Sequence, residues 1–167
     1  MMKTCPVRKT SPRLNGHDYS LPGLYFVTIN THKNIHIFGK IIQGKMQLNP
    51  AGNIVQNFWE NIPDHCPGLQ LDTFIVMPNH LHGILLLTDE SPNRKSVSEI
   101  IRGFKTWAAK KINEMHGNKG SPVWQRSFYD HIIRNEQSLA KIREYIINNP
   151  IKWEINMHYH SYEDLFM

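Results

Sequence analysis

The sequence predicts a protein of the α+β class, and three observations support this. Segments rich in β-branched and aromatic residues alternate with segments whose apolar residues follow helical spacing, in the order strand, helix, strand, strand, helix, strand, helix. One extra hairpin is inserted after the first strand. The chain of 167 residues, 40% of them hydrophobic, is long enough for one sizeable core. This order predicts a ferredoxin-like antiparallel sheet with helices packed on it and a C-terminal helix.

The N-terminal residues 1–23 are rich in Pro, Lys, Arg, Ser and Gly and show no period, so we expect a basic flexible arm. One domain over residues 24–167 follows. Its first strand is predicted at 25–31, where β-branched and aromatic residues dominate. Extended residues 38–42 and 46–48, separated by a turn, predict the inserted hairpin.

The first helix is predicted to begin at Asn49-Pro50 and to end at Pro63. Its apolar residues Ile54, Val55, Phe58 and Ile62 follow helical spacing. Two strands, 69–77 and 80–87, come next and are joined by the tight turn Pro78-Asn79.

The second long helix begins with Ser96-Val97-Ser98-Glu99, the pattern of a capping box. Its apolar side is predicted to consist of Ile100, Ile101, Phe104, Trp107, Ala108 and Ile112. A strand is predicted at the end of residues 123–134, and Asn135 is expected to cap a final helix that Pro150 stops.

Composition limits the class of protein. Nineteen basic residues against fourteen acidic ones give a formal charge of +5, which suits a polyanionic partner without proving one. Two cysteines are too few for a disulfide framework and favour a reducing cytoplasm. The N-terminus lacks the apolar stretch of a secretory signal, and no apolar run approaches the roughly 20 residues of a membrane-spanning helix, so we expect a cytoplasmic protein without a membrane partner.

His80 and His82 are the first candidates for chemistry. Alternate residues of a strand point to the same face, so the two imidazoles should lie side by side while Leu81 enters the core. Such a pair can hold one divalent metal ion, although two polar residues on the wet face of a sheet would show the same spacing. Gly83 would let another backbone or a substrate approach closely.

The final helix supplies the second set of candidates. Tyr145 and Asn149 are four residues apart and share a helix face with Lys141. Tyr145 offers a phenol nucleophile, and Asn149 offers an amide oxygen suited to Mg²⁺ or Mn²⁺. From helical spacing alone, however, Tyr145 would be a core residue beside Ile142 and Ile146.

Together these motifs resemble the single-tyrosine HUH endonucleases, specifically the insertion-sequence single-strand transposases and the REP-associated tyrosine transposases. The resemblance rests on Met77-Pro78-Asn79-His80-Leu81-His82-Gly83 and on Tyr145-Ile146-Ile147-Asn148-Asn149-Pro150, with support from Trp124-Gln125-Arg126. Insertion-sequence enzymes usually have Gln where this chain has Asn149, whereas the REP-associated branch tends to have Asn. The sequence therefore leans toward the REP-associated branch.

The resemblance implies that residues 24–167 form one HUH transposase-like catalytic domain. It makes Tyr145 the nucleophile and His80, His82 and Asn149 the ligands of Mg²⁺ or Mn²⁺. The implied reaction cuts and rejoins single-stranded, hairpin-containing DNA through a 5′-phosphotyrosine intermediate. Relatives act as monomers or as homodimers, and the sequence leaves both open.

Single-stranded DNA favours a basic groove and exposed aromatic rings. The candidates for these contacts in the domain are Lys105, Lys110, Lys111, Arg126, Arg134, Lys141 and Trp124. The arm residues Arg8, Lys9 and Arg13 could add charge, and Tyr129 could add a ring. His131 could contact DNA or support the site, although a hydrogen-bonded strand histidine fits as well.

Alternatives of three kinds share parts of the pattern: other histidine-dependent phosphoesterases, a binding module and an inactive relative. A histidine-triad nucleotide hydrolase would need a third alternating histidine where this chain has Ile84, and a two-histidine phosphoesterase would need a second His-x-Thr or His-x-Ser copy. A non-catalytic ferredoxin-like module that binds single-stranded nucleic acid would need aromatic residues on its central strands, on which the bases stack. A catalytically inactive relative of the transposases is the third alternative.

Overall fold

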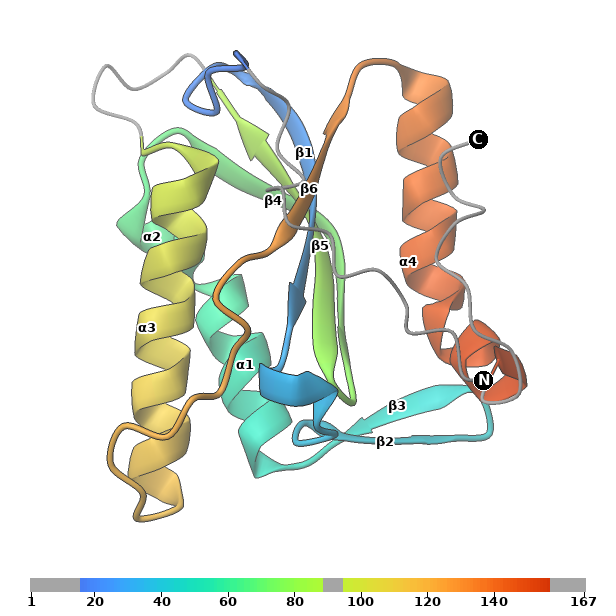
Figure 1. Cartoon of the computed structure of the whole chain (residues 1–167). Coiled ribbons are helices and arrows are strands. Elements are labelled where there is room, and N and C mark those ends of the chain that lie inside the picture. Colours follow the sequence, from blue (N-terminus) through green and yellow to red (C-terminus); the bar gives the residue numbers. More distant parts are fainter. Residues whose placement is uncertain (1–15, 89–94, 157–167) are drawn as a thin grey trace, which may run out of the picture.

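The computed structural model describes residues 16–88 and 95–156. Four strands form one antiparallel sheet in the order β4-β5-β1-β6, and two short strands form a separate hairpin (Figure 1). The elements are β1 (Gly23–Asn30), the 3-10 turn η1 (His32–Asn34), β2 (Gly39–Ile42), β3 (Lys45–Leu48), α1 (Pro50–Glu60), α2 (Ile62–His65), β4 (Leu69–Met77), β5 (His80–Leu87), α3 (Val97–Met115), β6 (Tyr129–Ile133) and α4 (Glu136–Asn156).

The predicted ferredoxin-like sheet is confirmed. With β1, β4, β5 and β6 counted as strands one to four, the spatial order from the β6 edge is four, one, three, two. Strands β1 and β5 therefore lie at the centre, and β1 pairs with both β5 and β6. The inserted hairpin β2–β3 is confirmed as well, and it turns through Gln43 and Gly44, both with positive φ as a two-residue hairpin turn requires.

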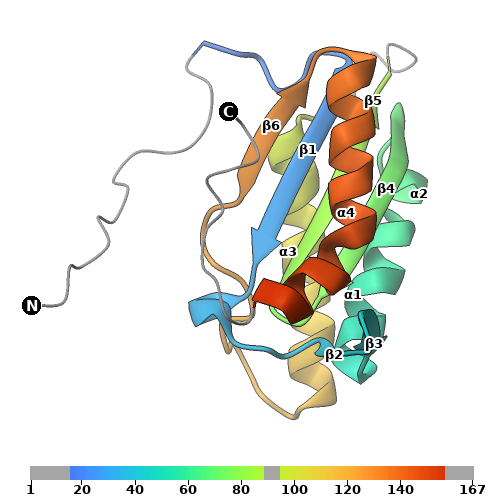
Figure 2. The same cartoon turned by 90° about the vertical axis from the view of Figure 1, so that its right-hand side faces the viewer.

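Helices cover both faces of the sheet. Helices α1 and α3 pack on one face, and α4 lies across the other, as Figures 1 and 2 show. The larger core lies between the sheet and the α1/α3 layer and contains the alternate residues Val27 and Ile29 of β1 with Leu81 and Leu85 of β5. A smaller core under α4 consists of Phe26, Ile84, Ile133, Leu139, Ile142 and Ile146.

The helix starts follow the expected capping chemistry. The Asn49 side chain accepts a hydrogen bond from the backbone of Gly52, and Ser96 and Glu99 form the full capping box of α3. Asn135 accepts from the backbone N–H of Ser138 at the start of α4. Each cap satisfies N–H groups that the first helical turn leaves unpaired.

Three details of the prediction are wrong. Pro63 does not close the first helix, because α1 ends at Glu60 and Pro63 lies in the first turn of α2, where proline is tolerated. Pro150 does not stop the last helix, since α4 continues to Asn156 and changes direction near its end (Figure 2). Trp107 is not part of the core of α3, because its side chain is 58% exposed.

Gly83 allows a close approach, but of a core side chain and not of a substrate. It lies on the α1/α3 face of β5, opposite to the histidines. A Cβ atom at Gly83 would overlap the indole ring of Trp59, which is fully buried. Glycine is therefore required here by packing.

We expect Gly83→Ala to lower the free energy of unfolding by about 1–3 kcal/mol, because the added methyl group overpacks a closed core. Urea denaturation followed by circular dichroism measures the change. The control is Gly103→Ala in α3, where a Cβ atom meets nothing within 4 Å. That variant should be stabilised by roughly 0.5–1 kcal/mol, as alanine replaces glycine inside a helix. Equal effects of the two changes would contradict this explanation.

Candidate functional site

The two histidines form a buried pair on the α4 face of the sheet. His80 and His82 are each 1% exposed, and their ring centroids are 4.4 Å apart. They are therefore not polar residues on a wet sheet face. The alternation of β5 brings them to one side while Leu81 enters the opposite core, as the sequence predicted.

Each imidazole is held through its Nδ1 atom. Nδ1 of His80 lies 2.6 Å from Oδ1 of Asn79, whose amide group in turn donates to the Asn34 carbonyl. Nδ1 of His82 lies 2.8 Å from the hydroxyl of Thr28, its direct partner on β1. Because the Asn79 oxygen can only accept, the proton of His80 resides on Nδ1 and the Nε2 lone pair stays available.

Burial keeps both rings uncharged. It lowers the pKa of His80 to about 4, and this effect outweighs that of the nearby Asn149 side chain, which raises the pKa. Burial also holds the pKa of His82 well below its usual range, and the neighbouring His80 adds to this effect. Both imidazoles are thus neutral at pH 7, the form in which histidine binds metal ions.

Helix α4 places Tyr145 directly against this pair. The Tyr145 hydroxyl lies 3.4 Å from Nε2 of His82, and the two ring centroids are 5.2 Å apart. Phe26 stacks on His82 at an interplanar angle of 29° and meets Tyr145 edge-on. Tyr145 is half-buried at the border of the smaller core, so it is neither a pure core residue nor a free surface phenol.

Asn149 completes the predicted constellation. It is 6% exposed, one helical turn beyond Tyr145, and its side chain is near enough to His80 to affect the pKa of that ring. The structure thus brings together all four residues predicted for catalysis and metal binding, and all four belong to one chain.

The donors at this site fit a divalent cation. Nε2 of His80 is buried and has no hydrogen-bond partner among the described residues, an arrangement that costs free energy unless another group binds there. Within the described residues no group of three His, Cys, Asp or Glu side chains could hold a metal ion. Within this part of the chain a third protein ligand would therefore be of another type, and the amide oxygen of Asn149 meets that need.

Two residues beyond Pro150 also reach the site, and the sequence analysis missed them. The ammonium group of Lys152 lies 5.4 Å from the centroid of the Tyr145 ring. The Trp153 ring contacts those of His80 and His36, with centroids 5.6 Å and 5.4 Å away. Extending the helical spacing of Tyr145 and Asn149 past the proline would have found both.

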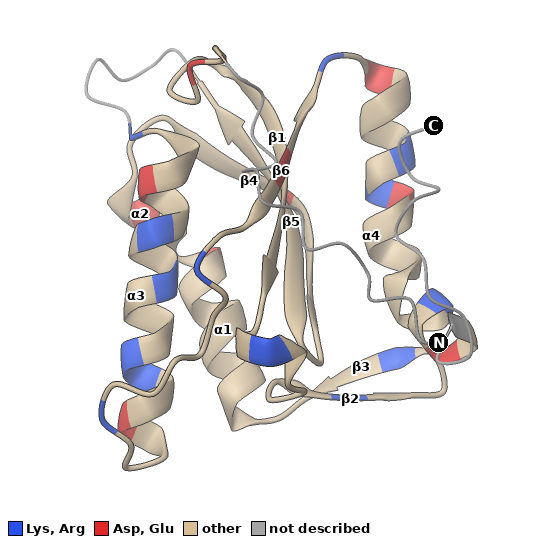
Figure 3. Ribbon diagram, in the orientation of Figure 1, with Lys and Arg blue, Asp and Glu red and all other residues tan. Residues whose placement is uncertain are grey.

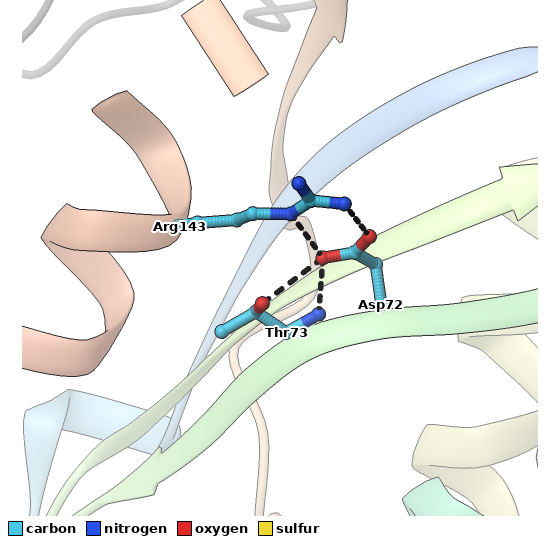
Figure 4. A network of polar contacts seen from close by, with 3 residues as sticks. All are labelled: Asp72, Thr73 and Arg143. Carbon is cyan, nitrogen blue, oxygen red and sulfur yellow. Dashed lines mark hydrogen bonds and ion pairs between the residues drawn. The ribbon is translucent and has the colours of Figure 1, made fainter. Parts of the chain in front are cut away.

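An ion pair ties α4 to the edge of the sheet. Arg143 donates through Nε and Nη2 to both carboxylate oxygens of Asp72, at 2.9 and 2.6 Å (Figure 4). Asp72 lies at an irregularity in β4 where the register with β5 shifts, and its Oδ1 also accepts from the backbone and hydroxyl of Thr73. The pair is bidentate and two residues from Tyr145, so it helps to fix the helix that carries the phenol.

The hydrogen bond from Arg143 lowers the pKa of Asp72 to about 2, so folding favours its ionised form. This contribution to stability is present above the ordinary pKa of 3.8 and is lost as the pH falls from 3.8 toward about 2. We expect Asp72→Asn to be less stable than the wild type near neutral pH, with the difference narrowing through this window. Urea denaturation as a function of pH measures it, and the exposed Glu144→Gln on the same helix is the control. A difference that stays constant below pH 3 would contradict the role of the pair.

The basic residues predicted to bind DNA are spread over the molecule. Lys105, Lys110 and Lys111 lie on α3, which covers the sheet face opposite to α4 (Figure 3). Arg126 joins Lys105 and Arg102 around a shallow hollow between α3 and the segment before β6. The structure therefore does not gather these lysines around the histidine pair.

The remaining candidates differ in exposure. Arg134 and Lys141 are exposed, at the end of β6 and on α4, and so is the Tyr129 side chain. The expectation that Trp124 is open is wrong, because it is 8% exposed and packs against Phe38 and Phe104.

Lys105, His131 and the basic arm were also singled out from the sequence. The ammonium group of Lys105 donates to the carbonyls of Gln125 and Arg126, so it holds that segment against α3. His131 is half-buried on β6 opposite Phe26, and burial lowers its pKa. The arm residues Arg8, Lys9 and Arg13 lie outside the described residues.

Among the described helices none is long and apolar enough to cross a membrane.

Comparison with known proteins gives a consistent result. A family described as "Transposase IS200 like" matches residues 40–149, a segment that contains both histidines, Tyr145 and Asn149. An uncharacterized protein of Haemophilus influenzae is 39% identical over 168 aligned positions, covering 87% of this chain and 90% of that protein. Another protein of the same organism, assigned as a REP-associated tyrosine transposase, is 25% identical over 81% of this chain and 74% of its own length.

Solved structures show the same fold. The structure of a REP-associated tyrosine transposase bound to a REP hairpin has a TM-score of 0.60 at 21% identity, covering 84% of this chain and 74% of that one. A crystal structure of a Deinococcus radiodurans protein assigned as a transposase has a TM-score of 0.52 at 18% identity, covering 81% and 97%. At these identities the likeness establishes the fold.

Proposed function

This chain belongs to the IS200-like transposase family, and from that premise we propose that it cleaves and rejoins single-stranded DNA through a covalent link to Tyr145. The observation that carries the proposal is the 3.4 Å approach of the Tyr145 hydroxyl to Nε2 of His82. A nucleophile next to a pair of neutral imidazoles is the arrangement that metal-assisted attack on a phosphodiester needs. The same geometry gives little support to a purely binding module.

We propose that His80 and His82, through their Nε2 atoms, and Asn149, through its amide oxygen, hold one Mg²⁺ or Mn²⁺ ion. The ion would supply Lewis-acid stabilisation of charge at the scissile phosphate. Thr28 and Asn79 orient the two imidazole rings, since their side-chain oxygens are hydrogen-bonded to the Nδ1 atoms and leave the Nε2 atoms for the ion.

The residues of this chain then perform an in-line exchange of phosphate esters. Tyr145 loses its phenolic proton and its oxygen attacks phosphorus, while the bond from phosphorus to the 3′ oxygen breaks and that oxygen takes up a proton. The DNA 5′ phosphate is now joined to Tyr145. When a 3′ hydroxyl attacks this phosphotyrosine, the bond to Tyr145 breaks and a DNA phosphodiester is restored without ATP.

A folded DNA hairpin is the proposed substrate. One structural relative binds a REP hairpin, and the charge of +5 on this chain suits a nucleic-acid partner. All four proposed site residues lie close together within one chain, which supports a site built from a single protomer. Association into a homodimer and the location in the cytoplasm stay predictions.

The test uses the full chain and end-labelled single-stranded DNA that contains hairpins, with Mn²⁺, Mg²⁺ or EDTA. We expect a protein–DNA adduct that survives denaturation, together with a fragment ending in a 3′ hydroxyl, in both metals and not in EDTA. Tight binding of a hairpin library without any cleavage or adduct would overturn the proposal and favour a non-catalytic nucleic-acid-binding protein.

A further inference from the structure

The last turns of α4 extend the candidate site beyond the residues considered so far. Tyr145, Asn149, Lys152 and Trp153 are spaced as i, i+4, i+7 and i+8, so all four lie on one face of the helix. The family match ends at residue 149 and thus stops short of Lys152 and Trp153. These two residues follow Pro150, in the last turns of α4.

Aromatic rings form a continuous path from the buried histidines to solvent. The Trp153 ring contacts His80 on one side, at 5.6 Å and an interplanar angle of 38°. The Trp153 ring also contacts His36, at 5.4 Å and 60°. Trp153 is half-buried and His36 is exposed, so the outer part of this path is open to a ligand.

A positive charge lies next to the same path. Lys152 is exposed, and its ammonium group stands over the ring of Tyr145 at 5.4 Å. Rings beside a cation are the combination that binds a nucleotide, since a base stacks on the rings and a phosphate pairs with the ammonium group.

We propose that Trp153, His36 and Lys152 form a binding subsite for one nucleotide of single-stranded DNA, next to the histidine pair. The base stacks on the open rings of Trp153 and His36, and the phosphate that follows it binds Lys152. The subsite rests on the proposed function for its position, because it places a nucleotide within reach of Tyr145. It contributes binding and orientation and forms no bond.

Stacking on this surface does not depend on which base is present, because every base has a π face. The subsite therefore holds a nucleotide near the scissile phosphate without selecting its sequence. Other parts of the protein must then recognise the DNA sequence or the hairpin.

Binding is measured without metal, in EDTA, by fluorescence anisotropy. One probe is a labelled oligothymidylate, and the other is a chain of abasic deoxyribose phosphates of the same length. We expect Trp153→Leu to weaken binding of the oligothymidylate roughly tenfold, the effect of one lost stacked base, and to leave the abasic chain unaffected. Lys152→Gln should weaken binding of both probes.

A variant on α3 provides the matched control. Trp107 is exposed on the opposite side of the sheet and also has a lysine over its ring, with Nζ of Lys110 at 5.3 Å. Trp107→Leu therefore removes the same kind of ring from a different place. Trp153→Phe keeps a π face and should retain most of the oligothymidylate binding.

Three outcomes would overturn the subsite. The first is an equal loss of oligothymidylate binding in Trp153→Leu and Trp107→Leu. The second is a loss of abasic-chain binding in Trp153→Leu as large as its loss of oligothymidylate binding. The third is unchanged binding of both probes in Trp153→Leu. If Trp153→Leu does not fold, His36→Ala on the exposed turn must weaken oligothymidylate binding without weakening abasic binding. A protein that binds as expected but never cleaves would refute the proposed function and leave the subsite intact.

Discussion

A Tyr145→Phe variant should form no covalent adduct with DNA and should cleave no hairpin substrate in either metal. Removal of one oxygen atom eliminates the only group that the proposal joins to phosphorus, so the loss is complete and not partial. The ring, its edge-on contact with Phe26 and its packing next to Ile142 and Ile146 are retained. The fold and the binding of DNA should therefore be close to those of the wild type.

The control for this experiment is Tyr129→Phe. Tyr129 is 51% exposed on β6 and opposes Thr28 in the sheet, but no contact of its hydroxyl with the histidine pair is seen. Adduct formation is measured by denaturing gel electrophoresis, and binding by anisotropy with the same labelled hairpin. An adduct that persists in Tyr145→Phe would show that another residue is the nucleophile, whereas loss in both variants would point to a general effect of removing phenols.

Much of the site could be predicted because short-range patterns determine it. The alternation of β5 places His80 and His82 together, and the spacing of Tyr145 and Asn149 places them on one helix face. Which face of α4 packs on which face of the sheet depends on the tertiary structure, so these spacings do not determine it. In the prediction the resemblance to a known family supplied this link, since spacing alone would have assigned Tyr145 to the core.

The supporting residues could not be predicted because they depend on strand register. Thr28 binds His82 only because the two are direct partners between β1 and β5. The pair Asp72–Arg143 lies at an irregularity in β4, and no short motif in the sequence marks that irregularity. Gly83 looked like an opening for a substrate, yet the other face of the same strand accommodates Trp59 there.

Local rules failed where packing opposes them. A proline inside a helix removes one hydrogen bond and costs about 3 kcal/mol, which is why Pro150 was expected to end α4. In the fold Asn149 and Pro150 are buried, and Ile151 beyond them lies against Gly44 of the hairpin. These contacts offset the penalty, and the continued helix brings Lys152 and Trp153 to the site.

The tryptophans show the same limit. Trp107 shares a broad apolar stripe with Phe104, yet the stripe is wider than the face that α3 buries, so Trp107 is left at its border. Trp124 comes from an irregular segment that looked exposed, but a bridge to Thr31 carries it into the core. Exposure of a single large side chain therefore depends on where neighbouring elements dock.

His80→Ala and His82→Ala should each abolish tight binding of Mn²⁺ and, with it, cleavage. Loss of a hydrogen-bond partner behind a metal ligand typically costs 10–100-fold in affinity, so loss of the ligand itself should cost more than about 100-fold. Thr28→Val, which removes only the partner of His82, should fall within that smaller range. Isothermal titration calorimetry with Mn²⁺ measures these affinities without DNA, and His65→Ala on the exposed end of α2 serves as the control.

The pH dependence gives a separate check on the same pair. Burial lowers the pKa of His80 to about 4 and holds the pKa of His82 well below its usual range, so both rings stay neutral when an exposed histidine with a pKa of about 6.5 would be protonated. Mn²⁺ affinity at a pH of about 5.5 should therefore remain close to that at pH 7. In the unfolded chain the same rings take up protons below about pH 6.5, so the metal-free protein should lose stability as the pH falls from there toward about 4. An affinity that drops about tenfold or more between pH 7 and 5.5 while the protein stays folded would show that exposed histidines, and not this buried pair, hold the metal.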